Sequence, residues 1–132
     1  MSALEIILPY PPAGTTGNHA VKHARGGHYL TTATKRYRYA VMMCCATQRA
    51  RRQLAGPLLV EWAFNPPDRR ARDSDNVLKT LKDAMTAAGV WIDDSNKVIR
   101  RESIEWLEPL TDGRVVVHIR AMSDEKNTPE GE

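Results

Sequence analysis

The stretch of sequence that determines the fold is LLVEWAFNPPDRRARDSDNVLKTLKDAMTAAG, residues 58–89. Its first seven residues, 58–64, are mostly apolar and predict a central strand. A polar connection follows, and residues 76–88 then repeat apolar side chains at the spacing of one helix face. That face comprises Val77, Leu78, Leu81, Ala84, Met85 and Ala88, and Gly89 suits the left-handed position after a helix end. The stretch therefore predicts a strand that leads into an amphipathic helix.

The N-terminal part of the chain predicts one more strand and one more helix. Residues 4–8 are apolar and predict a short strand that ends at a proline-rich segment. Residues 13–27 lack an apolar period and predict a long loop. Thr32 is the expected cap of a helix over 33–52, whose face toward the core comprises Tyr37, Ala40, Val41, Cys44, Cys45 and Gln48.

The C-terminal part of the chain predicts the remaining strands and the limits of the domain. Residues 98–107 and 114–121 predict a pair of strands joined by a turn at 111–113. The order of elements favours an α+β (mixed α/β) domain, in which two main helices pack on a small mixed sheet. A chain of 132 residues suits one domain, here expected over residues 1–122, with a disordered acidic tail over 123–132.

The distribution of charge indicates a polyanionic partner. The chain has 19 Lys and Arg residues against 16 Asp and Glu residues, but four of the acids and one lysine lie in the last ten residues. The formal charge of residues 1–122 is therefore +6, which suits nucleic acid. The sequence lacks an apolar run of the roughly 20 residues that span a bilayer, a basic leader and a glycine-rich phosphate loop. We therefore expect a cytoplasmic protein without a membrane partner or a nucleotide cofactor.

Two pairs of acids are candidate ligands of a metal ion. Asp73 and Asp75 lie two residues apart, so in an extended segment both carboxylates can face one cation. Mg²⁺ prefers such hard oxygen ligands, with Mn²⁺ as an alternative. Capping of the following helix by a single acid is the structural alternative. Asp93 and Asp94 follow an apolar step, where they either form a turn or supply a third carboxylate for phosphodiester hydrolysis.

Basic side chains accompany these acids. Arg69, Arg70 and Arg72 directly precede Asp73, and they predict either contacts to phosphates or an ordinary solvated loop. Lys79 follows Asp75 by four residues, on the polar side of the predicted helix. Its ammonium group would either stabilise charge on a phosphate or form an ion pair with Asp75 one helical turn away. Helical spacing leaves both interpretations open.

The chain resembles the RusA family of Holliday junction resolvases over about residues 4–121. The resemblance rests on the proline-rich opening at 8–12, on residues 26–29, and on the paired blocks DRRARDSDNVLK at 68–79 and AGVWIDD at 88–94. It implies a Mg²⁺-dependent, homodimeric endonuclease, often encoded by a phage or prophage, that nicks opposed strands of a four-way DNA junction.

The resemblance also implies roles for single residues. The essential carboxylates and the essential lysine would be Asp73, Asp75, Asp94 and Lys79. Arg72 matches a basic position that contacts DNA, and Asp93 matches the less important acid of a pair. Family members often carry Ser-x-Asn soon after the prolines, whereas this chain has AGTTGN at 13–18. Asn18 is therefore the expected replacement for that DNA contact.

The sequence is compatible with three hypotheses for function. The first is a junction resolvase, the second a metal-dependent nuclease for replication forks or flaps, and the third a branched-DNA-binding module without catalysis. The acids weigh against the third, because binding alone gains nothing from carboxylates that face phosphates. Two symmetric nicks require two copies of one set of acids, so a homodimer is expected. The apolar surface of Trp62, Trp91 and Trp106 also exceeds what a small sheet should bury.

Overall fold

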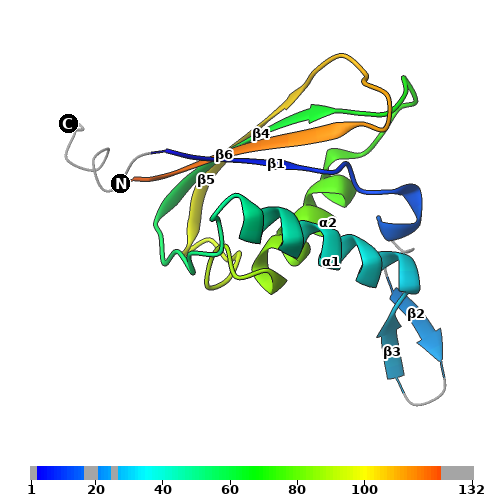
Figure 1. Cartoon of the computed structure of the whole chain (residues 1–132), viewed down its shortest axis with the longest axis horizontal. Helices are drawn as coiled ribbons and strands as arrows, with labels where there is room; N and C mark the ends of the chain where they lie inside the picture. The colour runs from blue at the N-terminus through cyan, green and yellow to red at the C-terminus, as the bar shows by residue number, and fades with distance from the viewer. Residues whose placement is uncertain (1–2, 17–20, 25–26, 123–132) are drawn as a thin grey trace.

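Figure 1 shows the computed structural model of the chain, which describes residues 3–16, 21–24 and 27–122. The predicted tail over 123–132 and the candidate residue Asn18 lie outside the described residues. Two helices pack on one side of a four-stranded mixed sheet, so the predicted α+β class is confirmed (Figure 1). In this described part of the chain, neither helix is long and apolar enough to cross a membrane.

The main sheet has the strand order β1-β6-β4-β5. β4 pairs antiparallel with β6 and parallel with β5, and β1 pairs antiparallel with β6 at the other edge. Residues of β1 alternate between buried and exposed, which is typical of a sheet with one covered face. The prediction of a central strand at 58–64 is confirmed, since β4 is an interior strand. The four strands span Leu4–Leu8 (β1), Leu58–Asn65 (β4), Ile99–Trp106 (β5) and Arg114–Ala121 (β6).

The prediction that the last two strands form a hairpin is wrong, because β4 lies between β5 and β6. The connection over 107–113 passes across the end of β4 instead of turning back on itself. Its course is fixed by three hydrogen bonds to the end of β4 and the residue beyond: Leu107 N–H to Phe64 O (2.7 Å), Asn65 Nδ2 to Glu108 O (2.8 Å) and Leu110 N–H to Pro66 O (2.9 Å). β4 thereby pairs along both of its edges, which satisfies the backbone groups of a buried strand.

The helix after β4 agrees closely with the prediction. α2 spans Ser74–Ala87, and all six residues of its predicted apolar face are buried against the sheet and α1. It begins two residues before the predicted start, because Asp73 is its N-cap. Gly89 has a φ of +83°, which confirms the predicted left-handed position after the helix.

The first helix is shorter than predicted. α1 spans Thr32–Thr47, and its N-cap is Thr31 rather than Thr32, since the Thr31 hydroxyl accepts a bond from Thr34 N–H at 3.2 Å. The helix ends five residues before the predicted end, where Arg49 adopts a φ of +59°. Gln48 does not complete an apolar face. Its amide forms two 2.8 Å hydrogen bonds with the backbone of Ile7 in β1, which ties the end of α1 to the sheet.

The prediction of one long loop over 13–27 is also wrong. A 3-10 turn, η1, spans Ala13–Thr15, and the strands β2 (Val21–Ala24) and β3 (Gly27–Leu30) form an antiparallel ribbon. This ribbon is a separate sheet that projects from the body of the molecule (Figure 1). Pairing of two backbones needs no apolar alternation when the ribbon joins no larger sheet, so the sequence carried no signal for it.

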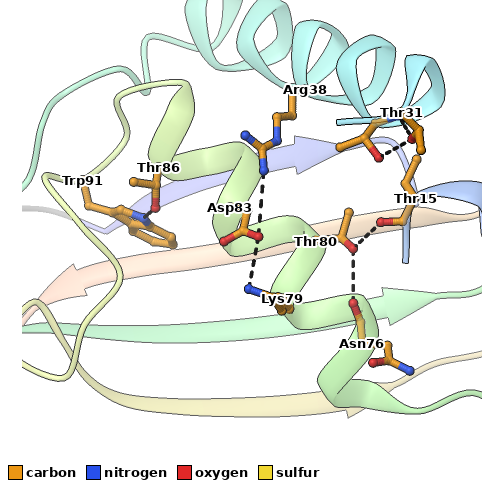
Figure 2. A network of polar contacts seen from close by, with 10 residues as sticks. Thr15, Thr31, Arg38, Asn76, Lys79, Thr80, Asp83, Thr86 and Trp91 are labelled. Carbon is orange, nitrogen blue, oxygen red and sulfur yellow. Dashed lines mark hydrogen bonds and ion pairs between the residues drawn. The ribbon is translucent and has the colours of Figure 1, made fainter. Parts of the chain in front are cut away.

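The core between the sheet and the helices contains two of the three tryptophans. Trp62 and Trp91 are 2% and 1% exposed, and their rings meet edge to face with centroids 6.5 Å apart. Trp91 also donates from Nε1 to the Thr86 hydroxyl at 2.7 Å (Figure 2). The sequence predicted that the apolar surface of all three tryptophans is more than a small sheet can bury. This prediction is wrong for Trp62 and Trp91. Trp106, at the end of β5, is 40% exposed.

Candidate active site

Asp73 and Asp75 lie at the start of α2 but differ in role. Asp73 has an extended backbone, and its Oδ1 accepts a hydrogen bond from Asp75 N–H at 2.9 Å. This contact is a helix cap, so Asp73 is the single acid that caps the following helix. Asp75 lies in the first turn of α2 with an exposed side chain, where the positive end of the helix favours an anion. Capping therefore accounts for Asp73, whereas the structural alternative for Asp75 is only its favourable position at the positive end of the helix.

A hollow of about 340 Å³ brings Asp75, Lys79 and Asp94 together. We call it the acidic hollow; its remaining lining residues are Leu78, Lys82, Asp83 and Glu102. Asp75 and Lys79 come from α2, whereas Asp94 comes from the segment between α2 and β5. The structure thus supplies the spatial proximity of residues 75 and 94 that the sequence could not give.

The segment that carries Asp94 is fixed by the core. Val90 and Trp91 are buried. The backbone N–H of Leu54 donates to Val90 O at 2.9 Å, and the Leu54 carbonyl oxygen accepts from Ile92 N–H at 3.0 Å. Asp93 closes the following turn, since its Oδ1 accepts from Ser95 N–H at 2.8 Å. Hydrogen bonds from the side chain and the backbone of Ser95 lower the pKa of Asp93. Asp93 therefore has a local structural role, whereas Asp94 lines the acidic hollow.

Lys79 forms an ion pair, but its partner is Asp83 rather than Asp75. Its ammonium nitrogen lies 3.4 Å from Asp83 Oδ2, and Arg38 of α1 approaches the same oxygen at 3.9 Å (Figure 2). The Lys79 side chain is 78% exposed. An exposed pair of this kind contributes only a few tenths of a kcal/mol. Lys79 can therefore leave Asp83 at little cost.

The sequence did not identify three charged residues that line the acidic hollow: Lys82, Asp83 and Glu102. Lys82 Nζ lies 2.6 Å from Glu102 Oε1, and the other Glu102 oxygen accepts from Trp62 Nε1 at 3.1 Å. This network joins α2 to β4 and β5 beside the hollow. The spacing of Lys79 and Asp83 along a helix could have indicated their pairing. Glu102 is brought to α2 by the sheet alone, so no local pattern could have found it.

The three arginines before Asp73 are held differently. Arg72 is 19% exposed and bonds to the Asp68 carboxylate at 2.9 Å and to the carbonyl oxygens of Asp68 and Arg70 at 3.1 and 2.9 Å. Hydrogen bonds from the Arg70 backbone, and then from the side chains of Arg72 and Arg70, lower the pKa of Asp68 to about 2. Asp68 therefore stays ionised at neutral pH and holds Arg72 in place. Arg69 and Arg70 are 80% and 83% exposed and remain accessible to phosphates.

Asp73 lines a second and larger concavity, of about 640 Å³, on the other side of the α2 N-terminus. In the described part of the chain, no three His, Cys, Asp or Glu side chains are close enough together to hold a metal ion. The donors near the start of α2 are nevertheless all carboxylate oxygens, the ligands that a hard divalent cation prefers. The chemistry of the donor set therefore fits such an ion: Asp75 and Asp94 line one hollow, and Asp73, two residues before Asp75, lines the neighbouring concavity.

Comparisons with known proteins find relatives over almost the whole chain. The family model described as Endodeoxyribonuclease RusA matches residues 9–120. Similar curated proteins include crossover junction endodeoxyribonuclease RusA of Shigella sonnei (strain Ss046) and of Escherichia coli (strain K12), and that of Enterobacteria phage 82. Each is 32% identical over 125 residues, which cover 95% of this chain and 100% of the relative.

Proposed function

The chain belongs to the RusA family of endodeoxyribonucleases, and from this membership we propose that it is a crossover junction endodeoxyribonuclease. Its substrate is a four-way DNA junction formed in recombination or repair. The observation that carries the proposal is the acidic hollow, where Asp75 and Asp94 lie with Lys79 beside the N-terminus of α2. Carboxylates together with an ammonium group suit phosphodiester hydrolysis better than simple binding of a polyanion.

The proposed site residues have separate tasks. Asp73, Asp75 and Asp94 would hold a divalent cation, which we propose to be Mg²⁺, with Mn²⁺ as an alternative. When bound, such an ion activates water and screens charge on a phosphate. The Lys79 ammonium, free to leave its weak pair with Asp83, would stabilise charge that grows on the phosphate. The exposed Arg69 and Arg70, with Arg72 and Asn18, would bind neighbouring phosphates of the substrate.

We further propose that the enzyme acts as a homodimer in the cytoplasm. One chain supplies a single set of three acids, whereas resolution of a junction requires two symmetric nicks. A two-fold dimer presents two sets to a junction that has approximate two-fold symmetry. The exposed apolar side chains of Trp106, Leu107 and Leu110, at the end of the edge strand β5, are suited to burial in such an interface.

A comparison of DNA substrates tests the proposed function. With Mg²⁺, the purified protein should cut a four-way junction at paired, opposed sites much faster than a fork, a flap or a linear duplex of the same sequence. In EDTA it should bind the junction without cutting it, because the acids then have no cation. The measurement is the rate of product formation on denaturing gels, with strand-specific labels. Preferred cutting of the fork or flap would favour the second hypothesis, and binding without cutting in any divalent ion would favour the third.

The salt dependence of binding tests the arginines. Each phosphate contact that is lost should flatten the log–log slope of affinity against salt by roughly one unit. Arg70→Ala should therefore flatten the slope, and Arg72→Ala should flatten it at least as much because Arg72 also orders the loop through Asp68. Titration of a labelled, uncut junction at several salt concentrations in EDTA measures the slope.

A matched control for this titration is Arg120→Ala on β6, since Arg120 lines neither the acidic hollow nor the larger concavity that Asp73 lines. Its slope should remain that of the wild type. If the Arg70 and Arg72 variants also keep the wild-type slope and affinity, the basic run over 69–72 is an ordinary solvated loop.

A further inference from the structure

The larger concavity beside the α2 N-terminus has the size and lining of a ligand pocket. We call it the proline–tyrosine pocket; the residues used below are Tyr10, Pro11, Pro12, Arg72, Asp73 and Asn76. Its volume of about 640 Å³ lies within the range of small-molecule sites. Apolar rings form part of its wall, and a guanidinium, a carboxylate and an amide supply polar groups. Of these residues, only Asp73 and Arg72 have a role in the hydrolysis proposed above.

The walls of the pocket are held rigidly. The Tyr10 ring lies edge to face against Phe64 at 6.5 Å, and the Arg72 guanidinium carbon lies 5.7 Å from the centre of the same ring. Gly113 approaches so closely, with a φ of +73°, that an added Cβ would lie 2.6 Å from Tyr10 Cβ. The turn after Pro12 is fixed to α2 through a 2.7 Å bond from the Thr80 hydroxyl to Thr15 O (Figure 2). The pocket is therefore formed before any ligand arrives.

Tyr10 carries a polar group that the fold leaves unused. Its side chain is 7% exposed, and its buried hydroxyl has no hydrogen-bond partner among the described residues. By contrast, the buried Tyr37 donates to Pro9 O at 2.7 Å, next to Tyr10 in the chain. Burial raises the pKa of Tyr10 more than the nearby Arg72 lowers it, so the hydroxyl keeps its proton at neutral pH. An orphaned buried hydroxyl destabilises a fold unless a bound water or ligand accepts from it, so Tyr10 holds a donor that a bound molecule can use.

The position of the pocket identifies the class of ligand. Asp73 lines the pocket, and Asp75, whose N–H bonds to Asp73, lines the acidic hollow on the other side of the helix start. A DNA strand whose phosphate lies at the acids therefore passes close to the pocket. Bases at a branch point unstack at low cost, and a flat base suits a site walled by prolines, an aromatic ring and a guanidinium.

We propose that the proline–tyrosine pocket binds an unstacked nucleobase of the junction strand, next to the phosphate that is cut. The Tyr10 hydroxyl, covered in the free protein, donates to an acceptor on the edge of the base once the base displaces the atoms that cover it. Asn76 offers an amide that can both donate and accept. Arg72 packs beside the base while Asp68 holds its guanidinium in position. The inference rests on the proposed function, since it needs a branched DNA substrate.

The test uses Tyr10→Phe, which keeps the ring and removes only the hydroxyl, and Tyr39→Phe as a control at a tyrosine that is 62% exposed on α1. Cut sites of the wild-type protein are first mapped in Mg²⁺ on a junction with a mobile crossover. A fluorescent base analogue, 2-aminopurine, is then placed beside the main cut site, and its fluorescence is followed during binding in EDTA. Wild-type protein and Tyr39→Phe should raise the fluorescence, because the base leaves the stack.

Tyr10→Phe should raise this fluorescence less and should spread the cuts over more positions. Loss of one hydrogen bond predicts a roughly three- to tenfold lower ratio of cutting at the main site to cutting elsewhere. Its melting temperature should equal or exceed that of the wild type, since the lost hydroxyl was unpaired. If Tyr10→Phe and the wild type agree in fluorescence and in cut sites, the base pocket is wrong while the resolvase remains. If the wild type does not bind a junction at all, both proposals are overturned.

Discussion

Asp75→Asn is expected to abolish junction cleavage while leaving the fold and junction binding intact. Asp75 is exposed at the start of α2 and lines the acidic hollow, so its charge serves no packing role. An amide has the same size as the carboxylate but cannot supply the charge that a divalent cation needs. The rate of cleavage should fall by on the order of a thousandfold, since metal ligation contributes several kcal/mol to such a reaction. Affinity for uncut junction in EDTA should hold or rise, because one repulsion of phosphate is gone.

The neighbouring acids provide matched variants for this experiment. Asp94→Asn should behave like Asp75→Asn, and so should Asp73→Asn, since asparagine also caps helices and therefore preserves the start of α2. Asp93→Asn is the control: it can still accept the bond from Ser95 N–H, and cleavage should stay within a few-fold of wild type. Circular dichroism and thermal unfolding establish that each variant is folded. Wild-type cleavage by any of the first three variants would remove that residue from the site.

Dimers that contain one wild-type and one Asp75→Asn subunit test whether the protein acts as a homodimer. If two copies act on one junction, a dimer with one Asp75→Asn subunit should nick one strand and rarely complete resolution. Separation of doubly tagged dimers, followed by cleavage of a junction held in a supercoiled plasmid, distinguishes single from paired nicks. Complete resolution by the mixed dimer, or a wild-type protein that sediments as a monomer on the junction, would contradict the proposed homodimer.

The sequence predicts most accurately the elements whose buried side chains can be identified from local periodicity. The apolar face of α2 was predicted residue by residue, because helical spacing alone decides which side chains meet the sheet. The prediction of a hairpin over β5 and β6 is wrong, because a seven-residue connection can either turn back or cross the end of another strand. Only its tertiary contacts with the end of β4 decide between the two. The ribbon of β2 and β3 depends on backbone pairing and therefore left no pattern.

The candidate site shows the same division between local and tertiary information. The position of Asp73 and Asp75 before a helix could be predicted, because caps and first turns have local signatures. The approach of Asp94 to Asp75 depends on how Leu54 pairs with the segment around Trp91, which is a contact between distant parts of the chain. The sequence gives no sign that Tyr10 is unusual, because a buried tyrosine is common and only the structure shows that its hydroxyl is unpaired.

Lys79→Ala is expected to lower the rate of junction cleavage by roughly a hundredfold, with little change in stability. One preorganised charge beside a transition state contributes about 3 kcal/mol when the site excludes water. The stability should change little because Lys79 is exposed and its pair with Asp83 is a single helical ion pair worth a few tenths of a kcal/mol. Single-turnover cleavage with saturating enzyme measures the loss in rate, and thermal unfolding measures the stability.

Asp83→Asn separates the two interpretations of Lys79. It removes the partner of the ion pair but leaves the ammonium group in the acidic hollow that Asp75 and Asp94 also line. If Lys79 acts on the phosphate, Asp83→Asn should keep cleavage within a few-fold of wild type while Lys79→Ala loses it. If Lys79 serves only as a structural partner of Asp83, both variants should lose little stability and keep the same turnover per folded molecule; Asp83→Asn should lose slightly more stability, because Arg38 also approaches Asp83. Equal effects of the two variants would therefore remove Lys79 from the catalytic site, since a shared ion pair would explain both.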